Sequence, residues 1–318
     1  MTKTSPVNTD LTEENQRKVF GEVIADGSWH KMLVDYYHHT LQLVEHPPYT
    51  KYEDRTRQTA YITCALKSLG YAFSGVANGT DFCRDEKLQK QMFDQFLDIM
   101  IKEMTFQRLL KYMNLTETSQ NAQYLLLGGL INSLLTLIHN FLFYYEPCIP
   151  TFRERGMMSI ARNIRRNSDD SDIKTSALVI IAYLLIESDD KAQMEMSDEE
   201  LQYLINELEK SMLPKSQSEY HPAELINALN RIAVVDVNKL KLIEAGMLPL
   251  LTRSLDKKCS PEHQEAAVNA IWNLAFTNES KQKIMKHDGL MKGIMHIVYF
   301  KPERRGNRLR FVHMLEQI

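Results

Sequence analysis

The chain has 318 residues, a formal net charge of −3 and 25% charged residues. These values are ordinary for a folded protein, and such weak acidity gives no overall electrostatic reason to bind nucleic acid. Glycine (12 residues) and proline (10) are scarce, and no run of alternating apolar and polar residues is bounded by hairpin turns. Composition therefore predicts an all-α protein, long enough for two compact domains or one elongated array.

The compartment is predicted from the N-terminus and the cysteines. The first twenty residues are polar and lack the apolar run of a secretory signal. The chain contains no CxxC pair, and its four scattered cysteines are Cys64, Cys83, Cys148 and Cys259. We expect neither a disulfide framework nor a zinc ribbon, and we expect a cytoplasmic protein.

Helical periodicity covers most of residues 1–115, in the segments 12–24, 29–44, 52–69 and 86–112. We expect this region to hold divergent helical repeats and an end cap, because a terminal repeat needs a polar outer face. A separate helical domain is the alternative.

Two groups of N-terminal residues resemble ligand sites only superficially. Gly70, Gly75 and Gly79 do not have the spacing of a phosphate-binding loop. His38, His39 and His46 stand near Glu45, but adjacent histidines point about 100° apart on a helix. We expect a turn-rich loop and ordinary histidines, with neither a metal nor a cofactor.

Residues 118–145 contain no charged side chain, which suggests either a membrane span or a buried helix. A span needs about 20 predominantly apolar residues. This stretch includes Asn132, His139 and Asn140, and polar groups without partners cost several kcal/mol each in the bilayer. We therefore predict the core helix of a soluble protein.

The second half of the chain repeats. The segments 135–156, 225–246 and 268–289 are each 22 residues long and end in glycine. In each, an asparagine precedes the glycine by sixteen residues, and these asparagines are Asn140, Asn230 and Asn273. Gly246 and Gly289 are 43 residues apart. A period of about 40–47 residues with two or three helices per unit predicts an α-solenoid.

One further unit fits between Gly156 and Gly246, which are 90 residues apart. In that unit Tyr183 replaces the asparagine and Glu199 replaces the glycine. Each unit is predicted to contain a long helix such as 261–276, a short helix such as 279–286, and a third helix after the glycine. Ser260 is a suitable N-cap and Pro261 suits a first helical turn, as does Pro222 one unit earlier.

The sequence "EAAVNAIWNLA" at 265–275, followed by residues 281–295, resembles an armadillo repeat, and so does 240–255. The resemblance implies an all-α, right-handed superhelix, with about four repeats over 116–300 and a basic segment at 301–318. In armadillo proteins the long helices line a concave groove, and an asparagine at this position pairs with the main chain of an extended peptide.

The resemblance therefore assigns partner binding to five residues: Asn140, Asn230, Asn273, Asn269 and Trp272. The competing interpretation is that these amides only tie adjacent helices together. Nuclear-import receptors place tryptophan four residues before that asparagine, whereas here Thr136, Ile226 and Asn269 occupy those positions. Recognition of nuclear signals is therefore not expected.

We expect a non-catalytic scaffold that binds a protein or peptide partner, because no constellation of catalytic residues is present. Nucleic-acid, membrane and small-molecule partners are not expected. The basic segment 301–310 is predicted to be a solvated tail, with a nucleic-acid or lipid contact as the alternative. The alternative function is a sensing or autoinhibitory array within a longer signalling protein, for example one with a Toll/interleukin-receptor-type domain.

Overall fold

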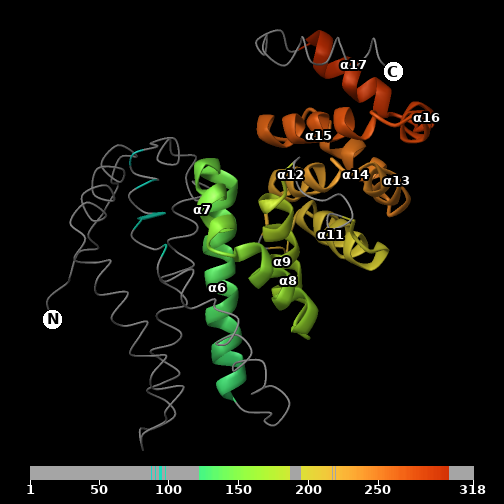
Figure 1. The fold of residues 1–318 in the computed structure, drawn as a ribbon. Coiled ribbons are helices and arrows are strands. Elements are labelled where there is room, and N and C mark those ends of the chain that lie inside the picture. The colour runs from blue at the N-terminus through green and yellow to red at the C-terminus, as the bar shows by residue number, and fades with distance from the viewer. Residues whose placement is uncertain are drawn as a thin grey trace, which may run out of the picture. The chain divides into compact units, whose positions relative to one another are not determined.

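The structure is a computed structural model that describes residues 122–186, 195–216, 218 and 220–300, together with isolated positions between 87 and 97. The chain comprises two compact units, Met1–Ser176 and Ala177–Ile318. Every regular element in the described part is helical (Figure 1), which confirms the all-α prediction. The domain limits predicted at 115/116 and 300/301 stay predictions.

The histidines His38, His39 and His46, predicted to be ordinary, and the predicted glycine-containing loop at 70–79 lie outside the described residues. The same holds for Cys64, Cys83 and the basic segment 301–318.

The described part of the first unit is built around the charge-free stretch, which forms α6 (Ala122–Tyr144). Leu135, Ile138 and Phe141 of this helix are fully buried. Phe93 packs edge-to-face on Phe141, with ring centroids 5.5 Å apart. The stretch is therefore a core helix, as predicted. Among the described helices, none is long and apolar enough to cross a membrane.

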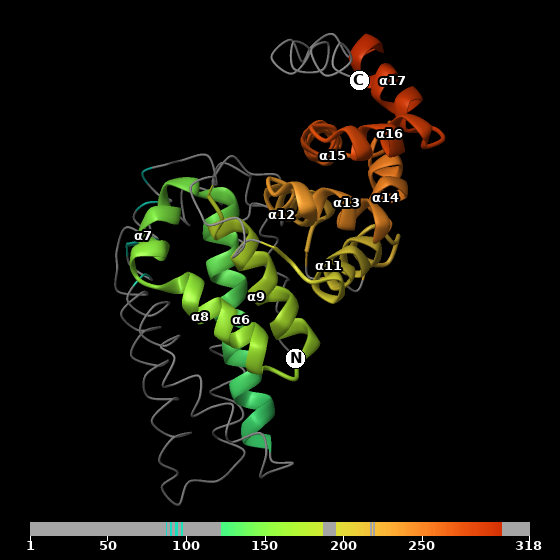
Figure 2. The same cartoon turned by 45° about the vertical axis from the view of Figure 1, so that its right-hand side comes forward.

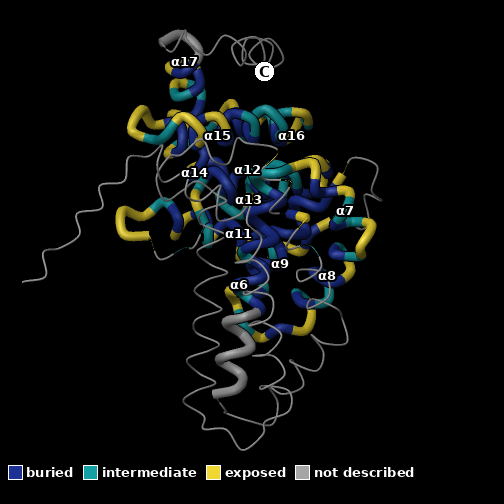
Figure 3. Tube along the Cα trace, turned by 90° about the vertical axis from the view of Figure 1, so that its left-hand side faces the viewer, coloured by how far each residue is buried: buried dark blue, intermediate teal, exposed yellow. Residues whose placement is uncertain are grey.

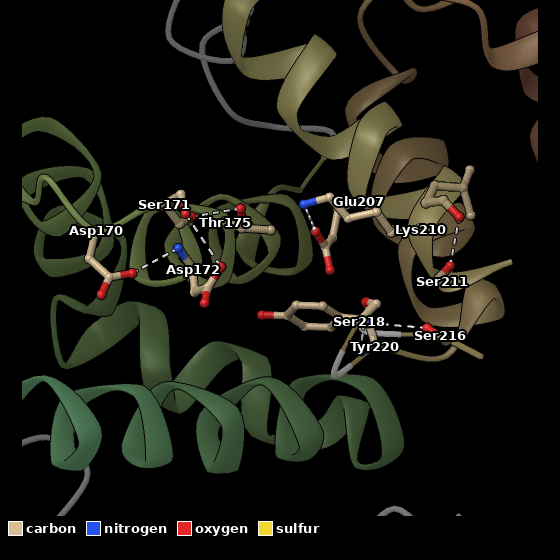
Figure 4. A network of polar contacts seen from close by, with 11 residues as sticks. Asp170, Ser171, Asp172, Thr175, Glu207, Lys210, Ser211, Ser216, Ser218 and Tyr220 are labelled. Carbon is tan, nitrogen blue, oxygen red and sulfur yellow. Dashed lines mark hydrogen bonds and ion pairs between the residues drawn. The ribbon is translucent and has the colours of Figure 1, made fainter. Parts of the chain in front are cut away.

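Three shorter helical elements follow α6 in the chain. They are η2 (Glu146–Cys148), α7 (Ile149–Glu154) and α8 (Met157–Asn167). The acidic turn after α8 starts the next helix, α9 (Ser171–Leu184). There Asp170 accepts a hydrogen bond of 2.8 Å from the backbone N–H group of Asp172 (Figure 4). It accepts a second, of 3.1 Å, from the backbone N–H group of Ile173. These contacts satisfy N–H groups that have no partner inside a helix, so the acidic run acts as a cap.

Two three-helix repeats are described in full within residues 220–300 of the second unit. The first consists of α12 (Pro222–Ile232), α13 (Asp236–Glu244) and α14 (Met247–Ser254). The second consists of α15 (Pro261–Leu274), α16 (Asn278–Lys286) and α17 (Leu290–Phe300). The predicted order of a long, a short and a third helix is confirmed, although α15 ends two residues earlier than predicted.

The helix starts use the chemistry that the sequence predicted. The Ser260 side chain accepts from the His263 backbone N–H and Pro261 occupies the first turn of α15. Pro222 has the same place in α12, where His221 is the N-cap and forms a capping box with Glu224. Both long helices therefore begin at fixed residues.

Left-handed glycines make the turns before the third helices. Gly156, Gly246 and Gly289 have φ angles of 81°, 97° and 82°. In the intervening unit the third helix is α11 (Asp198–Ser211), and its N-cap Ser197 is extended, with φ −71° and ψ 157°. Glu199 can replace glycine there because this turn uses a serine capping box and needs no left-handed residue.

Helices α12 and α15 form the central packing of the second unit and lie side by side in Figures 1 and 2. Helix α11 packs on α12, and α14 packs on α15. The buried residues of these helices are dark blue in Figure 3, and they include Leu225, Leu229 and Ile271. Each long helix is therefore covered on most sides, which leaves only a narrow set of positions that reach solvent.

Candidate partner-binding face

Four of the five predicted partner-binding residues lie on neighbouring helices of the second unit. Asn230 is near the end of α12, and Asn269, Trp272 and Asn273 are in the last turns of α15. All four are half-buried. Asn140 lies in α6 of the first unit and is only 5% exposed. Its alignment with the other asparagines along one surface stays a prediction.

The side chain of Asn273 ties α15 to α12. Its Nδ2 donates a hydrogen bond of 2.8 Å to the backbone carbonyl of Asn230, 43 residues earlier. That carbonyl is among the last four of α12, which have no N–H partner within their own helix. Asn273 therefore caps the C-terminus of the preceding long helix, as the competing interpretation of the sequence proposed.

The burial pattern corrects the register of the repeat by one residue. Ile232 and Leu274 end α12 and α15 and are 42 residues apart. Counted from these ends, the half-buried positions coincide: Asn227 with Asn269, Asn230 with Trp272, and Arg231 with Asn273. The 43-residue glycine interval pairs Asn230 with Asn273 instead, and it pairs buried Ile226 with half-buried Asn269.

The extra residue lies in the turn before the third helix. Three residues, His287 to Gly289, connect α16 to α17, whereas Ala245 and Gly246 alone connect α13 to α14. When residues are counted back from the glycine, every position of α12 is therefore paired with the position of α15 one residue beyond its structural equivalent. The glycines mark equivalent turns, but the helix ends define equivalent side chains.

Arg231 caps the C-terminus of α9, as Asn273 caps the C-terminus of α12. Its Nη1 donates to the carbonyl of Tyr183 at 3.5 Å, and its guanidinium lies 5.3 Å from the centre of the Tyr183 ring. Tyr183 is the penultimate residue of α9, so its carbonyl is also unsatisfied within its helix. The Tyr183 hydroxyl in turn donates to the Glu224 carbonyl at 2.8 Å.

The same three positions of α12 and α15 thus form one surface, which we call the partner face. It consists of Asn227, Asn230, Arg231, Asn269, Trp272 and Asn273. The sequence analysis named neither Asn227 nor Arg231, because the glycine-based register places Ile226 opposite Asn269 and Asn230 opposite Asn273. The four-residue spacing of Asn227 and Arg231, repeated between Asn269 and Asn273, is the signal that identifies them.

Three side-chain amides on this face are not tied to the rest of the described chain. Asn227 and Asn269 are half-buried, and their side chains form no hydrogen bond with another described residue. The Oδ1 atom of Asn230 is enclosed and also has no hydrogen-bond partner within the described ranges. Amide groups in such positions favour a partner that both donates and accepts.

An aromatic pair borders the partner face. The rings of Trp272 and Phe276 meet nearly edge-on, with centroids 5.5 Å apart. Phe276 is 57% exposed, and the ammonium of Lys239 lies 5.7 Å from its ring centre. The Lys239 Nζ atom forms an ion pair with Oδ1 of Asp236, at 2.6 Å. The pair offers an apolar platform, and the lysine of the preceding repeat packs against it.

Two buried titratable side chains outside the partner face, Cys148 and His139, are uncharged and belong to the packed core. Burial raises the pKa of the Cys148 thiol far above its ordinary value, so this cysteine is a poor nucleophile. Burial lowers the pKa of His139 to about 3, which keeps the imidazole neutral inside the core. Within the ranges that the structure describes, no group of three or more His, Cys, Asp or Glu side chains could hold a metal ion.

Two of the solved structures to which the chain is similar are designed proteins. The designed armadillo repeat protein YIII(Dq)4CqI is 19% identical, with a TM-score of 0.48, and the match covers 88% of this chain and 98% of that one. A second designed armadillo repeat protein, YIII(Dq.V1)4CPAF in complex with the peptide (KR)4, is 20% identical, with a TM-score of 0.45 and coverage of 88% and 98%. No curated protein matches the chain.

Three-helix repeats, left-handed glycine turns and long helices stacked in register define an α-solenoid of the armadillo type. The model of a protein family, the N-terminal part of the V-ATPase H subunit, matches residues 79–301. The chain belongs to this family, and the match contains both complete repeats and the partner face.

Proposed function

We propose that the chain is a non-catalytic, cytoplasmic interaction scaffold that holds a segment of a partner protein on the partner face. One observation carries the proposal. Two successive long helices leave the same three positions half-exposed and fill them with four asparagines, a tryptophan and an arginine.

The composition of the face suits protein recognition. A primary amide donates two hydrogen bonds and accepts two, so it can pair with either half of a peptide group. Tryptophan and arginine are enriched among the residues that dominate binding energies. Because the helices that carry these side chains are already packed, little ordering free energy is lost when a segment binds.

Site-specific photo-crosslinking tests the proposal. A benzophenone amino acid replaces Trp272 on the partner face or, as a matched control, Met285, which is 53% exposed on α16. Position 272 should give cross-links to one contiguous segment of a partner in cell extract, and position 285 should not. The same set of cross-links from both positions would show that the face is not the binding site.

Family membership supports a second, compatible candidate: the chain is a component of a V-ATPase. The observation that favours it is the match to the V-ATPase H subunit over residues 79–301. The sensing or autoinhibitory array of a longer signalling protein stays an alternative prediction.

The V-ATPase candidate is tested by mixing the purified chain with purified V-ATPase and measuring comigration on size exclusion. Wild type should comigrate, and absence of comigration removes the candidate. If the partner face makes the contact, the double variant Asn269→Ala/Trp272→Ala should comigrate less. If the variant comigrates fully, the contact lies elsewhere on the chain.

A further inference from the structure

We propose that the second unit has another interaction surface, where its long helices end, and that this surface binds a basic amphipathic helix of a partner protein. The surface consists of Ile186, Val234, Val237 and Phe276, and we call it the apolar strip. It shares no residue with the partner face, so the inference goes beyond the proposed function.

The apolar strip recurs with the long helices. Ile186, Val234 and Phe276 each stand two residues after the last residue of a long helix, α9, α12 or α15. They are 39%, 40% and 57% exposed, and Val237 in the first turn of α13 is 45% exposed. Single exposed apolar side chains are ordinary, whereas contiguous ones mark interaction sites. Recurrence of one exposed position in three successive repeats therefore indicates a site.

Contacts between repeats place these positions side by side. Arg231, at the end of α12, donates a hydrogen bond to the Tyr183 carbonyl at the end of α9. Asn273, at the end of α15, donates one to the end of α12 in the same way. The ring of Phe276 lies 5.7 Å from the ammonium of Lys239, so it reaches the short helix of the preceding repeat. The strip is therefore continuous from one repeat to the next.

The charged side chains beside the strip are acidic. Within the described turns 184–186, 233–237 and 275–279, the charged residues are Asp236 and Glu279, and both are exposed. Lys239 pairs with Asp236, but the lysine side chain is 4% exposed and the aspartate side chain 69%, so a partner meets the carboxylate. This surface complements a partner that carries Lys or Arg beside its apolar residues. An anionic membrane or a second copy of the strip would bring like charges together.

The spacing of the strip favours a helical partner. Long helices that pack side by side have axes about 8–10 Å apart. Residues seven apart on an α-helix lie on one face, about 10.5 Å apart along its axis. Residues on one face of an extended strand are about 6.6 or 13 Å apart, which does not match. A partner helix with one apolar residue per heptad can therefore contact each repeat of the strip in turn.

The test uses the full chain and a display library of randomised helical peptides, each about three heptads long. Peptides selected on wild type are synthesised, and their affinities are measured by fluorescence anisotropy. We expect apolar residues seven positions apart, flanked by Lys or Arg. Val234→Ser/Phe276→Ser should bind these peptides at least about tenfold more weakly. The matched control Leu213→Ser/Met285→Ser removes exposed apolar side chains outside the strip and should bind at wild-type strength.

Two further variants separate apolar contact from charge. Ile186→Ser/Val234→Ser leaves the aromatic ring of the strip in place, so it should melt like wild type and bind about fivefold more weakly. Glu279→Gln should weaken binding about twofold to fivefold and reduce its dependence on salt. Its matched control is Glu209→Gln, which removes an exposed acid from α11 and should change neither quantity.

Several results would overturn the inference. Equal affinities of wild type and Val234→Ser/Phe276→Ser would do so, as would selected peptides without basic residues. Peptides that keep their affinity when a central residue is replaced by proline would show that the occupant is not a helix. Cosedimentation with phosphatidylserine vesicles that is lost in the same double variant would identify a membrane surface instead.

A partner-face variant separates this inference from the proposed function. Asn269→Ala should leave peptide affinity unchanged, because Asn269 lies outside the strip. A loss of affinity in this variant, with none in Val234→Ser/Phe276→Ser, would place the peptide on the partner face. That result overturns the strip and leaves the proposed function intact. Absent cross-links at position 272, with strip-dependent peptide binding, would have the opposite meaning.

Discussion

The side chain of Asn273 donates a 2.8 Å hydrogen bond to the backbone carbonyl of Asn230, one repeat earlier in the chain. The bond joins the two long helices that form the centre of the second unit. It satisfies a carbonyl that α12 cannot satisfy itself. Asn273, which the armadillo resemblance assigned to partner binding, therefore has a structural role that does not depend on any partner.

Because of this bond, we expect Asn273 to contribute to the stability of the fold. Asn273→Ala should lower the free energy of unfolding by about 1–2 kcal/mol, because the Asn230 carbonyl loses its donor in a half-buried place. Asn269→Ala is the matched control on the same helix, and it should change stability by less than about 0.5 kcal/mol. Urea unfolding of the full chain measures both, and equal effects would contradict the assignment.

We expect Tyr183 to provide a second stabilising hydrogen bond between long helices, from α9 to α12. Its side chain is 2% exposed and its hydroxyl donates to the Glu224 carbonyl at 2.8 Å. Tyr183→Phe removes only this hydroxyl, so we expect a loss of about 1 kcal/mol. Tyr203→Phe, at a 38% exposed position of α11, should be neutral. A Tyr183→Phe variant as stable as wild type would show that the bond contributes nothing net.

The glycine turns give a prediction about backbone strain alone. A Cβ built on Gly156 or Gly246 meets no atom within 4 Å, so a substitution there introduces no clash. Gly246→Ala should still cost about 1–2 kcal/mol, because φ is +97°. Gly246→Asn should cost less, since asparagine tolerates this region. Thermal melting compares the variants, and an equal cost for alanine and asparagine would exclude backbone strain as the cause.

Two histidines near the starts of the long helices should make the second unit sensitive to acid. His263 is buried and its Nε2 lies 3.0 Å from the Ser254 hydroxyl oxygen. Burial, and secondarily the neighbouring His221, lower the pKa of His263 from 6.5 to about 4. Burial also lowers the pKa of His221, whose Nδ1 accepts the backbone N–H of Ala223.

The direction follows from proton binding. Between pH 6.5 and 4 the unfolded chain holds a proton on His263 that the folded chain does not, so stability falls as the pH falls through this window. At about 1.36 kcal/mol per pKa unit the shift corresponds to about 3 kcal/mol by pH 4, and solvent screening of the His263 ring, which is not fully enclosed, should reduce the loss to about 2 kcal/mol. His263→Gln should flatten the pH dependence of unfolding in urea. An unchanged slope in this variant would show that other groups cause the acid sensitivity.

Much of the helical framework could be predicted from the sequence. Ser260, Pro261 and Pro222 are local signals, and each acts within one helical turn of its own position. The left-handed turns at Gly156, Gly246 and Gly289 are equally local, because a positive φ is a property of the residue itself. The absence of charge in α6, together with the polar residues Asn132, His139 and Asn140 inside it, predicted a covered helix.

The candidate site was predicted less completely, because its geometry depends on contacts between repeats. Asn230, Asn269, Trp272 and Asn273 were placed on the correct helices, but Asn227 and Arg231 were not named. One additional residue in the turn before α17 displaced the register that the glycines implied. Spacing along the chain does not reveal whether an insertion lies inside a helix or in the turn after it.

The sequence by itself determined which residues form helices, where these helices begin and turn, and that they repeat. Those features arise from capping, backbone conformation and apolar periodicity, which all act over a few residues. The tertiary structure alone decided which side chains face one another across repeats. The donor from Asn273 reaches a carbonyl 43 residues away only because α12 and α15 pack side by side.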